Sequence, residues 1–167
     1  LALVDEGDEV LVFEPWFDIY AAGISLARGR RVGVPMAGPD LRPDLAALRA
    51  AVTPRTRLIL LNSPHNPTGG MLTRADLEAI AEVLRRHPEV WVYADEIYSK
   101  LVYDGDFVSI ATLPGMRERT VTLNGFSKTY AMTGWRVGYL AAPGDFVAKV
   151  TEPRHTLSIN TCTISQY

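Results

Sequence analysis

The sequence contains little cysteine, little lysine and no long apolar run. Cys162 is the single cysteine among 167 residues, so no disulfide can form within the chain, which fits a reducing cytoplasm. No apolar stretch approaches the roughly 20 residues of a membrane-spanning helix, so we expect no membrane partner. The net charge of −2 gives no electrostatic reason to expect nucleic acid as a partner either.

The size and composition are those of one globular domain. The chain is 47% hydrophobic and 22% charged, and its length is sufficient to bury a core. It opens within an apolar stretch, "LALVDEGDEV", that has neither an initiating methionine nor a secretory signal. It stops at "TISQY" where a new element would begin, so we interpret the chain as a piece of a longer protein.

Short β-rich apolar runs alternate along the chain with stretches of helical spacing. Strands are predicted over residues 9–13, 31–35, 56–62, 90–98, 120–124 and 136–143, and helices over residues 16–27, 43–52, 73–87 and 144–155. The clearest helix has Thr73 as its expected N-cap and an apolar face made of Leu77, Ile80, Ala81 and Leu84. This alternation predicts an α/β fold in which a mostly parallel sheet is sandwiched by helices.

Unusual polar residues fall at the ends of the predicted strands. Asn66 follows strand 56–62, Asp95 ends the apolar part of the strand beginning at residue 90, and Lys128 follows strand 120–124. Ligands of open α/β sheets bind at the carboxyl ends of the strands. This edge is therefore the predicted site.

Lys128 is the least ordinary of the three lysines. In "GFSKTYAMTGWRVG" (125–138) it has no charged neighbour until Arg136. A lone loop lysine usually lies on the surface, but an amine in a partly desolvated pocket has a lowered pKa and becomes nucleophilic toward carbonyls. Ser127 adds a hydroxyl, and the guanidinium of Arg136 suits a phosphate.

Two further motifs place polar side chains beside apolar ones. In "YADEIYSKLVYDG" (93–105), Asp95 interrupts an apolar strand, so we expect it to face a buried positive group, with Tyr98 three residues on. In "NSPHNPTGG" (62–70), prolines and glycines predict an irregular loop with a fixed backbone. This loop is either a plain strand-to-helix connection or a support that presents the Asn66 amide to a ligand.

Together these groups are what pyridoxal 5′-phosphate requires. Its aldehyde needs a lysine, its pyridine nitrogen a carboxylate, its ring oxygen neutral donors, and its phosphate hydroxyl and guanidinium donors. The three motifs, in this order, resemble those of the class I/II aminotransferases, which are fold-type I pyridoxal-phosphate-dependent enzymes. Over nearly its whole length, the chain is similar to the core of their large domain.

The resemblance implies roles for the residues that match the family motifs. Lys128 is the expected catalytic residue, which forms the internal aldimine and later moves the proton between the substrate α-carbon and the cofactor. Asp95 is expected to pair with the protonated pyridine nitrogen. Tyr98 and Asn66 are expected to hydrogen-bond the ring oxygen.

The remaining expected contacts hold the phosphate and cover the ring. Ser127 and Arg136 are expected to bind the phosphate. In "EPWFDIY" (14–20), Phe17 is the expected stacking ring, and the less favoured alternative is a core residue of helix 16–27. No metal site is expected.

The resemblance also implies an activity and an assembly. We expect a transaminase that takes an amino acid and a 2-oxo acid and works as a homodimer. Residues 1–167 would be an incomplete large-domain core, without the N-terminal part and the C-terminal small domain, and inactive in isolation. Two alternatives stay open: a carbon–sulfur β-lyase on the same scaffold, and a pyridoxal-phosphate-sensing domain of a transcription regulator.

Overall fold

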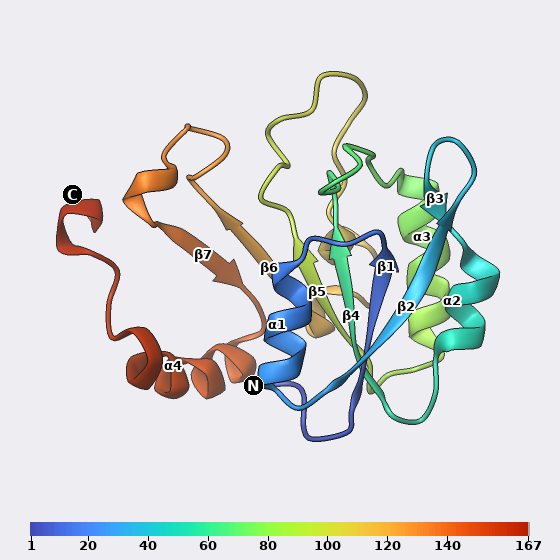
Figure 1. Ribbon diagram of the computed structural model, residues 1–167, viewed down its shortest axis with the longest axis horizontal. Coiled ribbons are helices and arrows are strands. Elements are labelled where there is room, and N and C mark those ends of the chain that lie inside the picture. The colour runs from blue at the N-terminus through green and yellow to red at the C-terminus, as the bar shows by residue number, and fades with distance from the viewer. Residues whose placement is uncertain (167) are drawn as a thin grey trace.

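A computed structural model describes residues 1–166, within which seven strands form one mixed sheet (Figure 1). The strands are β1 (Glu9–Glu14), β2 (Arg30–Ala37), β3 (Arg42–Pro43), β4 (Thr56–Asn62), β5 (Trp91–Asp95), β6 (Thr120–Gly125) and β7 (Gly138–Ala141). Their order is β3-β2-β1-β4-β5-β6-β7. The inner pairs are parallel, and only the pairs β2–β3 and β6–β7 at the two edges are antiparallel in the part described. The predicted fold class is confirmed.

The central strands are apolar on both faces because both faces are covered. In β1, Val10 and Val12 join the core cluster beneath α1 (Ile19–Leu26), whereas Leu11 packs into the cluster on the opposite face. In β4 the same alternation sends Leu60 to the α1 face and Ile59 to the other. Side chains alternate along a strand, so an uninterrupted apolar run marks a strand enclosed between two layers.

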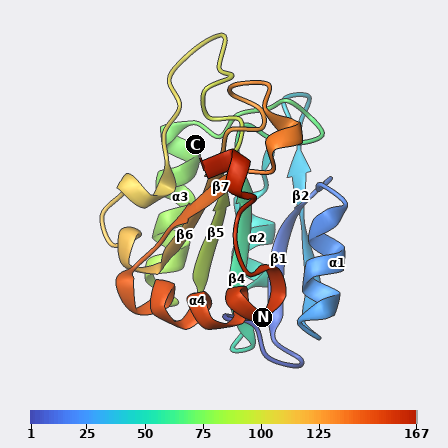
Figure 2. The ribbon, with the colours of Figure 1, turned by 90° about the vertical axis from the view of Figure 1, so that its left-hand side faces the viewer.

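The second face is covered by α2 (Leu45–Ala51) and α3 (Arg74–Arg85), and Figure 2 shows α1 and α3 on opposite sides of the sheet. Helix α3 follows the sequence prediction closely. Thr73 is its N-cap in a reciprocal capping box with Asp76, and the predicted apolar face is buried. Among residues 1–166, no helix combines the length and the apolarity needed to cross a membrane.

The sheet ends at β7, which is exposed at every residue. Gly125 and Gly138 let β6 and β7 approach closely, since a Cβ on Gly125 would lie 3.0 Å from the Val137 carbonyl. After β7, α4 (Gly144–Ser158) turns back and packs the ring of Phe146 against Trp91, with the ring centroids 5.2 Å apart.

Three predicted boundaries are wrong by three residues, and the others differ by less. The helix predicted over residues 16–27 begins only at Ile19, because the first helical turn is closed by Tyr20 N–H and Ala21 N–H donating to the carbonyls of Phe17 and Asp18. The strand predicted over residues 90–98 ends at Asp95, where the chain turns. The helix predicted over residues 144–155 continues to Ser158.

Candidate functional site

The predicted site residues follow three neighbouring strands at their carboxyl ends. Asn66 lies four residues after β4, Asp95 is the last residue of β5, and Lys128 lies three residues after β6. Since β4, β5 and β6 are adjacent and parallel, these loops leave the sheet at one edge, the upper one in Figure 1. The three residues thus lie at the expected edge of the sheet, and both the site and its ligand contacts stay predictions.

Asp95 is the best-buried of these side chains. It is 7% exposed, and its Oδ2 accepts a hydrogen bond of 2.7 Å from the hydroxyl of Tyr20, while its Oδ1 accepts one of 3.3 Å from the backbone N–H of Ile97. The buried positive group expected opposite Asp95 is not found among residues 1–166, where its side-chain partner is a neutral phenol. The burial itself is confirmed.

The side chain of Asn62 links two of the predicted site residues, Asp95 and Asn66, through hydrogen bonds. It is buried at the end of β4, its Nδ2 donates to the backbone carbonyl of Asp95 at 3.0 Å, and its Oδ1 accepts from the backbone N–H of Asn66 at 2.7 Å. One amide therefore ties the loop that carries Asn66 to the strand that carries Asp95. The loop is not a free connection, although this bond does not test what the Asn66 side chain binds.

Lys128 extends from the turn after β6. Its Nζ lies 5.9 Å from the centroid of the Tyr98 ring, so the predicted amine and the predicted phenol come together. Ser127 beside it is half-buried, but Lys128 is exposed. The partly desolvated pocket expected around this amine is therefore not formed within residues 1–166, because little is packed over residues 126–130.

Arg136 lies in the segment that leads into β7. It is exposed, its backbone has a φ of 53°, and its Nη1 donates to the carbonyl of Thr133 at 2.8 Å. A positive φ is uncommon for a residue other than glycine and costs energy that functional sites often store. Within the described residues no hydrogen bond joins Arg136 to Ser127, so their shared phosphate stays a prediction.

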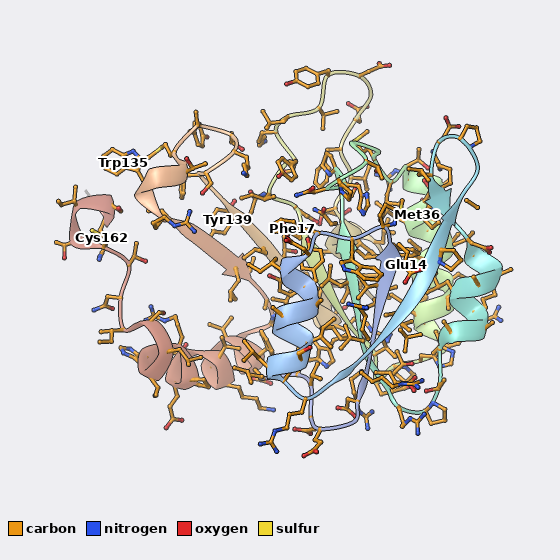
Figure 3. The ribbon with its side chains drawn as sticks, viewed as in Figure 1. Glu14, Phe17, Met36, Trp135, Tyr139 and Cys162 are labelled. Atoms are coloured by element: carbon orange, nitrogen blue, oxygen red, sulfur yellow. The ribbon has the colours of Figure 1, made fainter. Side chains whose placement is uncertain are left out.

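Phe17 lies before α1 rather than within it, which removes the interpretation of Phe17 as a residue of that helix. It is 37% exposed and packs edge-on against Tyr20, with the ring centroids 5.6 Å apart. Figure 3 shows it at the upper end of α1, level with the strand ends, whereas Trp135 and Tyr139 lie near β7. The aromatic side chains of the β7 region, Trp135 at 46% and Tyr139 at 53%, are exposed.

Sequence reasoning missed Tyr20, Asn62 and His65. His65 is buried in the loop after β4, with its Nδ1 2.8 Å from the Thr68 hydroxyl, and burial lowers its pKa. All three line an open hollow of about 470 Å³ (a volume that includes space open to solvent) between the ends of β1, β2 and β4. The signal for Tyr20 was its position three residues after Phe17, within the first turn of α1; the partners of the other two are not visible in a sequence.

Comparisons with known proteins agree with this geometry. The family described as aminotransferase class I and II matches residues 1–167. An aspartate/prephenate aminotransferase of Cereibacter sphaeroides is 43% identical over all of this chain, and an arginine–pyruvate transaminase of Pseudomonas aeruginosa is 47% identical over 87% of it. The solved aromatic aminotransferase of Pyrococcus horikoshii superposes with a TM-score of 0.95 at 42% identity over 99% of the chain.

These relatives are considerably longer than the chain. It spans 42% and 37% of the two curated proteins and 45% of the solved one.

Proposed function

Because the chain belongs to the class I and II aminotransferase family, we propose that it is part of an enzyme that moves an amino group from an amino acid to a 2-oxo acid, with pyridoxal 5′-phosphate as cofactor. Residues 1–167 form the incomplete core of the large domain in this proposal. The observation that carries it is the buried carboxylate of Asp95 at the carboxyl edge, next to the loops of Asn66 and Lys128.

The side chains at this edge fit the cofactor. A buried carboxylate is costly unless a positive group meets it, and within residues 1–166 Asp95 receives only a phenol O–H and a backbone N–H. The protonated pyridine nitrogen supplies such a group. When bound, the cofactor withdraws electrons from the substrate α-carbon, and that is the chemistry the reaction needs.

Each proposed role follows from the chemistry of one side chain. Lys128 would hold the cofactor by condensing with its aldehyde, with release of water. Once the substrate amine has displaced it, the free amine of Lys128 would take the proton from the substrate α-carbon as a general base and deliver it to the cofactor as a general acid. Asp95 holds the proton on the ring nitrogen. Tyr98 and Asn66 donate to the ring oxygen.

The phosphate and the ring face are held by residues at either side. Ser127 and Arg136 provide hydroxyl and guanidinium donors for the phosphate. The exposed ring of Phe17 covers the cofactor face. These contacts orient the cofactor, and they leave the choice of amino acid to residues outside this chain.

Replacement of Lys128 tests the proposal in the complete protein. Lys128→Ala is expected to lower amino transfer by at least roughly 10²–10⁴-fold, the usual value of one general acid–base group, and to remove the visible absorbance of the lysine-bound cofactor. Lys149→Ala, which changes an exposed lysine of α4, is the matched control and keeps both.

Borohydride reduction of the loaded protein gives an independent result. Peptide mapping is expected to find the reduced cofactor on Lys128. A label on another side chain, or a Lys128→Ala variant that keeps activity and absorbance, would overturn the assignment. A screen of amino donors with several 2-oxo acids would then identify the substrates.

The proposal includes a homodimer in the cytoplasm. It is supported by the exposed aromatic side chains of the 126–139 segment, which a partner could cover, and by the single cysteine, which needs no oxidising compartment. Light scattering on the complete protein measures the oligomeric state.

A further inference from the structure

We propose that Tyr20 is a positioning residue of this site, whose phenol holds the carboxylate of Asp95 in a single orientation for the ring nitrogen of the cofactor. This inference rests on the proposed function, since it needs Asp95 to be the partner of that nitrogen. It assigns a role to a side chain that belongs to none of the three family motifs quoted above.

The contact between the two side chains is short, buried and long-range. The Tyr20 hydroxyl lies 2.7 Å from Oδ2 of Asp95, and the two residues are 8% and 7% exposed. They are separated by 75 positions in the sequence, so the bond forms only when α1 is packed on its face of the sheet. Phe17 packs edge-on against the same phenol ring, which fixes the ring from its outer side.

The phenol is a permanent donor in this pair. Burial, followed by the charge of the Asp95 carboxylate, raises the pKa of Tyr20 far above its ordinary value of 10.0. The hydroxyl therefore keeps its proton wherever the enzyme works. Other titratable side chains near the pair are Tyr93, Tyr98 and Glu96, and the pKa of Tyr93 is raised to about 12 by burial and by Asp95.

The contacts of Asp95 leave room for one more donor. A carboxylate has about four lone-pair sites, of which one is taken by Tyr20 on Oδ2 and one by Ile97 N–H on Oδ1. Two donors on different oxygens stop the carboxylate from rotating. The remaining sites can accept the N–H of a bound heterocycle without any change of rotamer, which lowers the cost of binding.

Tyr20→Phe in the complete protein removes the hydroxyl and keeps the ring. Loss of a hydrogen bond to a charged group corresponds to a cofactor dissociation constant raised about tenfold. The pH midpoint of the visible absorbance change of the bound cofactor is expected to rise by about one unit. The reason is that a carboxylate free to rotate holds the proton on the ring nitrogen less firmly, and a ring without that positive charge leaves the lysine-linked nitrogen more basic.

Tyr93→Phe is the matched control. Tyr93 is a half-buried tyrosine whose pKa also responds to Asp95, but among the described residues its hydroxyl makes no hydrogen bond to that carboxylate. It is expected to change the dissociation constant less than twofold and to leave the midpoint in place. A third variant with 3-fluorotyrosine at position 20 keeps the shape and donates more strongly, so it is expected to move the midpoint downward.

The outcomes separate this inference from the proposed function. If Tyr20→Phe leaves both the dissociation constant and the midpoint unchanged, or shifts them no more than Tyr93→Phe does, Tyr20 has no positioning role. If Tyr20→Phe does not fold, an unmoved midpoint in the fluorotyrosine variant overturns the inference equally. If the unaltered protein takes up no cofactor, or Lys128→Ala keeps the absorbance, the proposed function itself fails.

Discussion

Replacing Asn62 by leucine should weaken both the fold and the cofactor site. Asn62→Leu keeps the branched shape of the side chain but removes the donor to the Asp95 carbonyl and the acceptor for Asn66 N–H. The Asp95 carbonyl retains a second donor, Ser63 N–H at 3.2 Å, so removing the bond from Asn62 costs little stability at this carbonyl. Asn66 N–H has no other acceptor among the described residues, and an orphaned donor costs roughly 1–3 kcal/mol.

The total expected loss of unfolding free energy is therefore about 2–4 kcal/mol, because the missing bond to Asp95 adds about 1 kcal/mol. Denaturant unfolding of the complete protein without cofactor measures it. Cofactor titration gives the second value: with the loop no longer tied to β5, the dissociation constant should rise about tenfold, or 1.4 kcal/mol.

Asn124→Leu is the control for Asn62→Leu. Asn124 also lies near the end of a strand, donates to the Ser99 hydroxyl at 3.0 Å and accepts from Gly125 N–H at 2.8 Å, but neither partner is a proposed cofactor contact. It should lose similar stability while keeping cofactor affinity. If Asn62→Leu binds the cofactor as tightly as the unaltered protein, the amide is only structural and the reasoning is refuted.

Two further predictions concern buried groups. Burial lowers the pKa of His65 below 6.5, so the folded state binds a proton at His65 less readily than the unfolded state. The contribution of His65 to the unfolding free energy is therefore fully present above pH of about 6.5 and declines as the pH falls toward the folded-state pKa. His65→Gln should flatten that decline in pH-dependent denaturation, and His155→Gln on the exposed part of α4 should not; equal slopes would contradict the assignment. Arg119→Met should cost roughly 2–4 kcal/mol, because the buried guanidinium donates to the carbonyls of Leu84 at 2.8 Å, Val90 at 3.0 Å and His87. Arg117→Met, on an exposed neighbour in the same short helix, is the control in the same denaturant assay, and equal losses would show that the buried contacts are not responsible.

Local sequence patterns were sufficient to place six of the seven described strands, all except β3, and the edge at which the candidate site lies. The continuous apolar runs of β1 and β4 mark strands covered on both faces, and a polar residue placed directly after such a run falls at the ligand edge. The capping residue Thr73 was also readable, because a capping box involves residues only three apart.

Contacts between residues far apart in the sequence could not be predicted from local patterns. Tyr20 meets Asp95 only through the packing of α1 on the sheet, and 75 intervening positions leave no local trace of that contact. Asn62 looks like any polar residue at a strand end, because its two partners are backbone groups of other segments. The exposure of Lys128 was missed for a different reason: desolvation depends on what is packed above the loop, which a motif does not state.

Strand β7 has a practical consequence for work with residues 1–167 alone. It is the outermost strand, and its outward N–H and C=O groups have no strand beside them within the described residues. An unpaired edge strand of this kind can form backbone hydrogen bonds with an extended segment of another chain. If the purified polypeptide associates through the edge of β7, the fraction of oligomer would rise with protein concentration. An oligomer formed by residues 1–167 alone would then not reveal the subunit arrangement of the complete protein.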